Sequence, residues 1–215
     1  MKLDQLVELA ERESSKLKDT VSIIGAFRDV KTHYDTVYKD LKDQLSSKLD
    51  NEIKQLSELK KEFIYSSEGQ HKRVIQVGSS KIFLKFDFGY GAKSKFGVQT
   101  KLNVERSDTN SVFFIELSPS EDFKAEPIDL DYPLNSKIER YGQQSNKELS
   151  TSDLTQIENY IQYLKLNIEY IENLKLEDCM YYLIQNSNAF HRPIFDSFSF
   201  QEVLEKALSL APNLK

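Results

Sequence analysis

The sequence predicts an α+β fold: a long N-terminal helical arm, an antiparallel sheet of about four strands in meander order, and C-terminal helices packed on one sheet face. Two observations carry this prediction. Apolar residues recur every three or four positions up to residue 63, and they alternate with polar residues between 73 and 117. The first spacing is that of an amphipathic helix and the second that of a half-buried strand. Strands followed by helices are typical of α+β proteins.

The helical arm begins with an amphipathic pattern over residues 3–18, which β-branched residues and Gly25 then interrupt. A second apolar stripe runs from Phe27 to Phe63, and its ten steps cover 36 residues, a mean of 3.6. A helix of that length spans about 55 Å at 1.5 Å per residue, so part of it should project or pack on another chain. We therefore place an N-terminal helical arm at residues 1–66, a candidate coiled-coil or interaction helix, and an α+β domain at 67–215.

The alternating pattern predicts four strands joined by short turns, at residues 74–78, 81–88, 95–105 and 112–117. Such strands form a meander with one buried and one solvated face. The polar residues 118–149, which include three prolines, are predicted to be a long loop.

The C-terminal part of the chain is predicted to be helical. The sequence Ser150-Thr151-Ser152-Asp153 supplies N-cap residues, and a stripe from Leu154 to Leu174 follows, which we expect to cover the sheet. A further helical stretch is predicted near 176–185, a turn at 186–193, and a short helix at 200–210.

This order of elements, with Tyr132-Pro133 after the fourth strand, resembles the RWD domain over residues 64–210. The resemblance implies an α+β fold that serves mostly in protein interaction. The second proline of that family's pattern is absent, because Lys137 stands four positions after Pro133.

The composition bounds the class of protein. A chain of 215 residues can bury a large core without a metal or disulfide, and a single cysteine, Cys179, excludes an intrachain disulfide and favours a reducing compartment. The chain has no apolar run long enough to span a membrane and no secretory pattern at its start. We therefore expect a cytoplasmic protein without a cofactor, a metal ion or a membrane partner.

The motifs argue against an enzyme without excluding one. Asp87-Phe88-Gly89 spells the kinase metal-binding triplet, but the lysine, glycine-rich loop and catalytic loop that should precede it are missing. The segment 89–94 lacks P-loop spacing, and the three histidines form no ligand pattern. We predict no catalytic residue; a hydrolase using carboxylates of residues 116–131 stays an alternative.

The long amphipathic helix favours a non-catalytic protein–protein interaction or assembly function, with a separate protein partner or a second copy in a homodimer. The expected interface residues are Tyr34, Val37, Tyr38, Leu41, Leu45, Leu49, Ile53 and Leu56. The competing interpretation is that the helix folds back on its own domain.

The distribution of charge suggests a second alternative, the binding of nucleic acid or another polyanion. Residues 71–106 carry eight Lys or Arg and two acids, a sum of +6, whereas residues 107–138 carry seven acids and two Lys, a sum of −5. Cations around an exposed aromatic ring can hold phosphates and stack a base. The residues expected on this basic strand face are Lys81, Phe83, Lys85, Lys95 and Lys101. The acidic segment could fold back and neutralise them.

Overall fold

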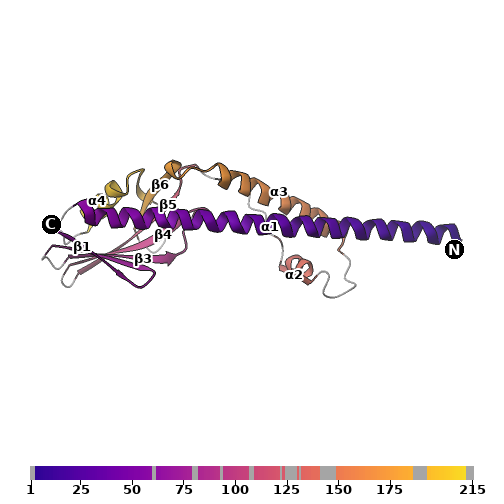
Figure 1. Cartoon of the computed structure of the whole chain (residues 1–215), viewed down its shortest axis with the longest axis horizontal. Helices are drawn as coiled ribbons and strands as arrows, with labels where there is room; N and C mark the ends of the chain where they lie inside the picture. Colours follow the sequence, from indigo (N-terminus) through magenta and orange to yellow (C-terminus); the bar gives the residue numbers. More distant parts are fainter. Residues whose placement is uncertain are drawn as a thin grey trace. The chain divides into compact units, whose positions relative to one another are not determined.

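A computed structural model of the chain describes residues 3–59, 62–78, 82–92, 94–106, 109–121, 123, 130, 132–140, 149–185 and 193–211. They form an α+β fold with a long N-terminal helix and an antiparallel sheet (Figure 1). The chain forms two compact units, one of residues 1–38 and 123–173, the other of residues 39–122 and 174–215. Helix α1 (Leu3–Leu59) contributes its first part to the first unit and its second part to the second.

The first unit is helical, and its core lies where α1 meets α2 (Tyr132–Arg140) and α3 (Thr151–Asn173). The buried residues of this core are Ile24, Phe27, Leu134, Ile138, Leu149, Ile157 and Ile161. Helix α2 lies in the stretch predicted to be a loop, and Tyr132-Pro133 opens it. The helix is short, and Leu134 and Ile138, one turn apart, are its buried residues among the side chains that the structure describes.

Helix α3 begins where the sequence predicts, at the N-cap residues 150–153. The backbone N–H of Asp153 donates to Ser150 Oγ over 3.1 Å, and the backbone N–H of Ser150 donates to Asp153 Oδ2 over 2.9 Å. This reciprocal arrangement is a capping box. The bond from the Ser150 backbone, with Lys137 3.1 Å away, holds the pKa of Asp153 below its usual value.

The second unit contains one antiparallel sheet whose strands lie side by side in sequence order. The strands are β1 (Phe63–Glu68), β2 (Lys72–Val77), β3 (Ile82–Tyr90), β4 (Val98–Arg106), β5 (Thr109–Pro119), β6 (Cys179–Gln185) and β7 (Pro193–Ser197). The predicted number of about four strands is therefore wrong, because the sheet has seven.

The helix predicted near 176–185 is also wrong. Residues 176–178 form a single 3-10 turn, and residues 179–185 form β6, an inner strand between β5 and β7. Because Leu183 and Ile184, which point to opposite faces, are both buried, the apolar residues of β6 make an almost continuous run. Such a run does not distinguish a buried strand from a buried helix.

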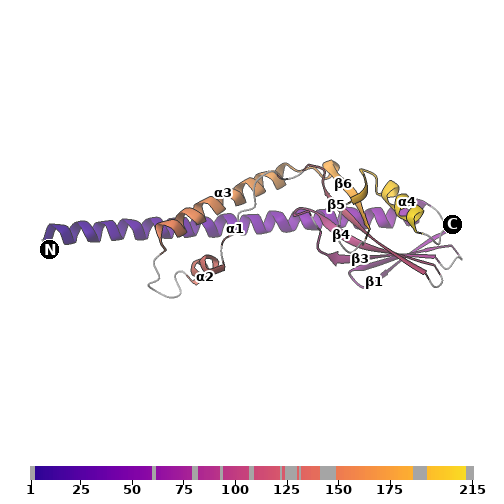
Figure 2. The same cartoon turned by 180° about the vertical axis from the view of Figure 1, so that it is seen from behind.

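One face of the sheet is covered by the second part of α1 and by α4 (Phe200–Leu210), as Figure 2 shows from behind. Tyr181 of β6 touches both helices: its hydroxyl lies 3.4 Å from Glu52 Oε1, and its ring meets Phe200 edge-on with centroids 5.5 Å apart. The expected cover was α3, but Ile157 and Ile161 of α3 lie in the core of the first unit. Helix α4 packs on the sheet against β6 and β7.

Candidate functional site

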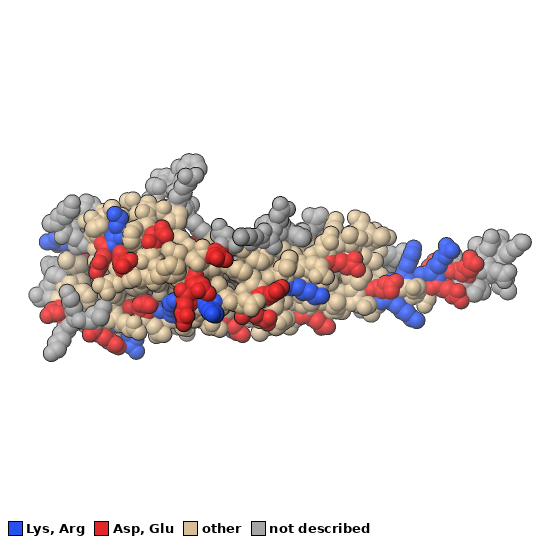
Figure 3. Space-filling model, turned by 90° about the horizontal axis from the view of Figure 1, so that it is seen from above, with Lys and Arg blue, Asp and Glu red and all other residues tan. Residues whose placement is uncertain are grey.

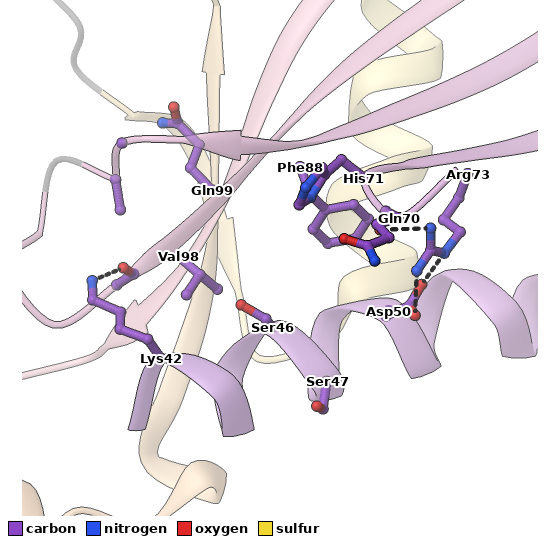
Figure 4. A pocket seen from close by; sticks show the side chains of 13 residues that line it. Lys42, Ser46, Ser47, Asp50, Gln70, His71, Arg73, Phe88, Val98 and Gln99 are labelled. Carbon is purple, nitrogen blue, oxygen red and sulfur yellow. Dashed lines mark hydrogen bonds and ion pairs between the residues drawn. The ribbon is translucent and has the colours of Figure 1, made fainter. Parts of the chain in front are cut away.

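A pocket of about 520 Å³ opens in the second unit between α1 and strands β2, β3 and β4 (Figure 4). Its size lies within the usual range of small-molecule sites. One side is formed by α1 from Lys42 to Asp50. The other is formed by the turn before β2, by Arg73 of β2 and Phe88 of β3, and by the start of β4 with the residues before it. Its polar side chains therefore come from segments that are distant in the sequence.

At one end of the pocket, an ion pair joins α1 to the sheet. Arg73 of β2 donates from Nε to Asp50 Oδ1 over 2.8 Å and from Nη2 to Asp50 Oδ2 over 3.0 Å. Its Nη1 donates to the carbonyls of Gln70 and Lys72. The hydrogen bonds that Arg73 donates to Asp50 raise the pKa of Arg73. Because Arg73 donates to both carboxylate oxygens of Asp50, this carboxylate is not placed to act as a general base on a bound molecule.

At the other end, Lys42 of α1 donates to the carbonyl oxygen of Gly97. Burial lowers the pKa of Lys42, and the nearby Glu116 opposes that shift. Glu116 is itself buried and accepts a hydrogen bond from the backbone of Ser94 over 2.9 Å. A Cβ at Gly97 would lie 2.8 Å from Ser118 Cβ. The turn 94–97 is thus fixed against β5, and Lys42 is committed to holding it.

Between these two ends, Ser46 points from α1 towards the strands, and Gln70, His71 and Phe88 lie together on the opposite side (Figure 4). These groups suit the binding of a small polar molecule. Among the described lining residues Asp50 is the one carboxylate, so these residues offer no pair of carboxylates for acid–base work. In the described part of the chain, no group of three or more His, Cys, Asp or Glu could hold a metal ion.

The carboxylates that the hydrolase alternative needs are spread out where they are described. Glu116 lies on β5, buried next to Gln99, and Glu121 is exposed just beyond the end of that strand. The other acids of residues 116–131 lie outside the described residues. The alternative therefore gains no site from the described residues.

The predicted interface residues occupy two environments. Leu41, Leu45, Leu49, Ile53 and Leu56 are each exposed by 6% or less, in the part of α1 that covers the sheet. Tyr34, Val37 and Tyr38 are half-buried. The rings of Tyr34 and Tyr38 stack with centroids 5.6 Å apart, and burial raises the pKa of both hydroxyls. A partner could reach the five apolar side chains only by displacing the sheet, and their part in assembly stays a prediction.

The predicted basic strand face is only partly assembled. Strand register places Phe83, Lys85 and Lys101 on the sheet face opposite α1, whereas Lys95 lies in the turn before β4 and Lys81 lies outside the described residues. Lys85 pairs with Glu105, and Lys101 stands directly across from Asp87. The described ionisable residues of this face on β1 to β5 are Glu68, Lys72, Lys85, Asp87, Lys101, Glu105 and Glu116. Apart from the buried Glu116, the described carboxylates and cations of this face are equal in number, and polyanion binding stays a prediction.

The first turns of α1 form an exposed surface that contains none of the predicted interface residues. Every residue from 11 to 19 is exposed, and the apolar side chains of Leu17 and Val21 are exposed by 61% and 55%. Figure 3 shows basic and acidic side chains next to one another at this end of the helix. We call residues 3–21 the N-terminal segment. In the sequence, the helical spacing of apolar residues from Leu3 onward indicates this segment, because it predicts an apolar stripe that another surface should cover.

Comparison of the chain with protein-family models, with curated proteins and with solved structures finds no match. No helix in the described part of the chain combines the length and the apolar character that a membrane span requires. The functional argument therefore rests on the pocket and on the N-terminal segment.

Proposed function

We propose that the protein is a non-catalytic interaction or assembly module, and that it contacts its partner through the N-terminal segment of α1. One observation carries this proposal. Every residue from 11 to 19 of this helical segment is exposed. The large apolar side chains of Leu17 and Val21, near the end of the segment, are more than half exposed. The interaction function is the one expected from the sequence, but the surface is different.

The energetics of helices support an interaction role for this segment. The end of a helix that lacks tertiary contacts frays easily, because packing supplies most of the stability of helices in proteins. Residues 11–19 have no cover from the described part of their own chain. Burying a leucine or valine side chain is worth about 1.5–3 kcal/mol. A partner that covered Leu17 and Val21 would stabilise the helix and the complex together.

The alternatives have weaker support. Polyanion binding would have to overcome the carboxylates that surround Lys85 and Lys101. An enzyme would need reactive groups that converge, and Asp50, the one carboxylate among the described lining residues of the pocket, is bound by Arg73. The pocket remains suited to binding a small polar molecule, which is compatible with an interaction module.

The test is site-specific photo-crosslinking in living cells. A benzophenone amino acid replaces Leu17 in one variant, and replaces Leu166 of α3, which is 50% exposed, in a matched control. We expect position 17 to yield a discrete covalent adduct with a protein, either a different protein or another copy of the chain, which mass spectrometry identifies. If position 17 gives no more adduct than position 166, the proposal fails.

A further inference from the structure

We infer that the pocket between α1 and strands β2 to β4 binds the uncharged base of a nucleoside, and that adenine is the base that its side chains fit. This inference is independent of the proposed function, because the described residues that line the pocket belong to the second unit and the N-terminal segment belongs to the first. It joins three observations: the charged groups of the pocket are paired, its neutral polar groups face the open space, and one wall is held in place by hydrogen bonds.

The charged side chains of the pocket have partners within the protein. At one end, Lys42 donates to the carbonyl oxygen of Gly97, and the buried carboxylate of Glu116 lies near its ammonium group. At the other end, Arg73 donates to both carboxylate oxygens of Asp50. A charged ligand would have to separate one of these pairs, and a charged group that loses its partner in a partly buried site is costly. The pocket therefore favours a ligand without net charge.

The neutral polar side chains of the pocket are available to a ligand. Ser46 points from α1 towards the strands, and Gln70 and His71 lie together across the open space, next to Phe88 (Figure 4). The side chains of Ser46, Gln70 and His71 make no hydrogen bond with another residue in the described part of the chain. A hydroxyl, an amide and a neutral imidazole can each both donate and accept. They suit a ligand that carries donors and acceptors side by side along its edge.

The wall that carries Gln70 and His71 is held by hydrogen bonds to its backbone. Nη1 of Arg73 donates to the carbonyl of Gln70 over 3.1 Å, and the backbone N–H of Phe88 donates to the carbonyl of His71 over 2.7 Å. Because Arg73 is itself bound by Asp50, this turn is tied both to α1 and to β3. A site whose backbone is already ordered loses less entropy when a ligand binds.

A flat heterocycle matches these groups. The half-buried ring of Phe88 has the guanidinium carbon of Arg73 5.7 Å from its centroid, which keeps the ring in position at the wall. Aromatic side chains at such walls stack nucleic-acid bases. A glutamine amide next to the ring can pair with adenine by two hydrogen bonds, accepting one from the N6 amino group and donating one to N7. Gln70 supplies that amide, and the pocket, at about 520 Å³, has the size of a small-molecule site.

The test is isothermal titration calorimetry of the purified full chain with adenosine at up to about 2 mM. We expect binding with a dissociation constant below about 1 mM. Inosine, in which a carbonyl oxygen replaces the N6 amino group, should bind at least about fivefold more weakly, because Gln70 can then form only one of the two hydrogen bonds. Adenosine monophosphate should bind no more tightly than adenosine, since the charged side chains of the pocket are already paired. Ribose alone should not bind.

Two pairs of variants locate the binding site. Gln70→Ala changes an exposed side chain and should raise the dissociation constant of adenosine at least about fivefold; its matched control, Gln201→Ala on the exposed side of α4, should leave it unchanged. Phe88→Leu keeps an apolar side chain but removes the flat ring, and should weaken binding by a similar factor. Its control is Phe83→Leu, on the same strand but on the opposite face of the sheet. Thermal melts followed by circular dichroism verify that each variant is folded.

Three results overturn the inference. The first is the absence of any heat of binding at 2 mM adenosine. The second is binding of ribose, or of adenosine monophosphate more than about tenfold tighter than adenosine, because the ligand would then be a sugar or an anion. The third is adenosine binding that neither Gln70→Ala nor Phe88→Leu weakens, because the site would then lie elsewhere. None of these measurements involves Leu17, so each leaves the proposed function unchanged.

Discussion

The two parts of α1 have the same helical periodicity but different surroundings. Between residues 41 and 56, the apolar stripe lies under the sheet, and its five large side chains are exposed by 6% or less. Between residues 11 and 21, Leu17 and Val21 are more than half exposed. An amphipathic stripe on a helix predicts that another apolar surface will cover the stripe. Which surface does so depends on contacts with residues far away in the chain.

The largest difference between the two parts should appear when leucines are truncated. Leu49→Ala removes a side chain with no exposed surface and should lower the free energy of unfolding by about 2–5 kcal/mol. Leu17→Ala, measured at a concentration where the chain is monomeric, should change it by less than about 0.5 kcal/mol. Urea unfolding followed by circular dichroism measures both. Equal losses would mean that residues 11–21 are packed within the monomer.

The ion pairs on α1 should show a smaller difference in the same direction. Asp50 pairs with Arg73 across to β2, whereas Asp35 pairs with Lys31 on the same exposed helix surface, 2.6 Å apart. Asp50→Ala should cost about 1–2 kcal/mol, because a partly buried guanidinium loses its bidentate partner. Asp35→Ala should cost at most about 0.5 kcal/mol. A double-mutant cycle with Arg73→Ala would sharpen the first value, and a coupling energy near zero would contradict it.

The smallest expected effect is a gain of stability within α1. A Cβ at Gly25 would meet nothing within 4 Å, so Gly25→Ala should raise the free energy of unfolding by about 0.5–1 kcal/mol through helix propensity. Gly97→Ala is the contrasting variant, and it should destabilise the protein because its Cβ would lie 2.8 Å from Ser118 Cβ. Thermal melts would compare the two. A loss at Gly25 would indicate that the helix needs to bend there.

The elements that could be predicted from sequence are those with a strong local pattern. The long stripe of α1, the alternation in β3 and β4, and the cap at Ser150 each depend on residues close together in the chain. Strand β1 lacks such a signal because it is an edge strand with mostly exposed residues, and Phe63 also fits the helical stripe before it. Strand β7 begins at Pro193, a residue tolerated at the first position of an edge strand but typical of a turn.

The candidate site was harder to predict because its parts meet only in three dimensions. Asp50 and Arg73 come from a helix and a strand, and Lys42 meets Gly97 across a longer separation. The basic strand face shows that charges close in sequence can also be a poor guide to the charges that lie together in the fold. Counting charges along residues 71–106 finds an excess of cations, but strand pairing puts Glu105 beside Lys85 and Asp87 beside Lys101. The register of strand pairing determines which charges lie next to one another, and this register is known only from the folded sheet.

Residues 123–173 of the first unit are inserted between strands β5 and β6, and this position affects how the sheet can assemble. Strands β5 and β6 are neighbours, yet residues 120–178 separate them in the sequence, whereas two residues separate the end of β4 at Arg106 from the start of β5 at Thr109. Closing a flexible loop costs about 0.6 kcal/mol of chain entropy for each doubling of its length, so β5–β6 pairing bears a larger entropic cost than the hairpins before it. Helices α2 and α3 form within that loop and shorten the length of chain that is free to fluctuate. Ordering of the helical insertion therefore lowers the entropic barrier to adding the last two strands.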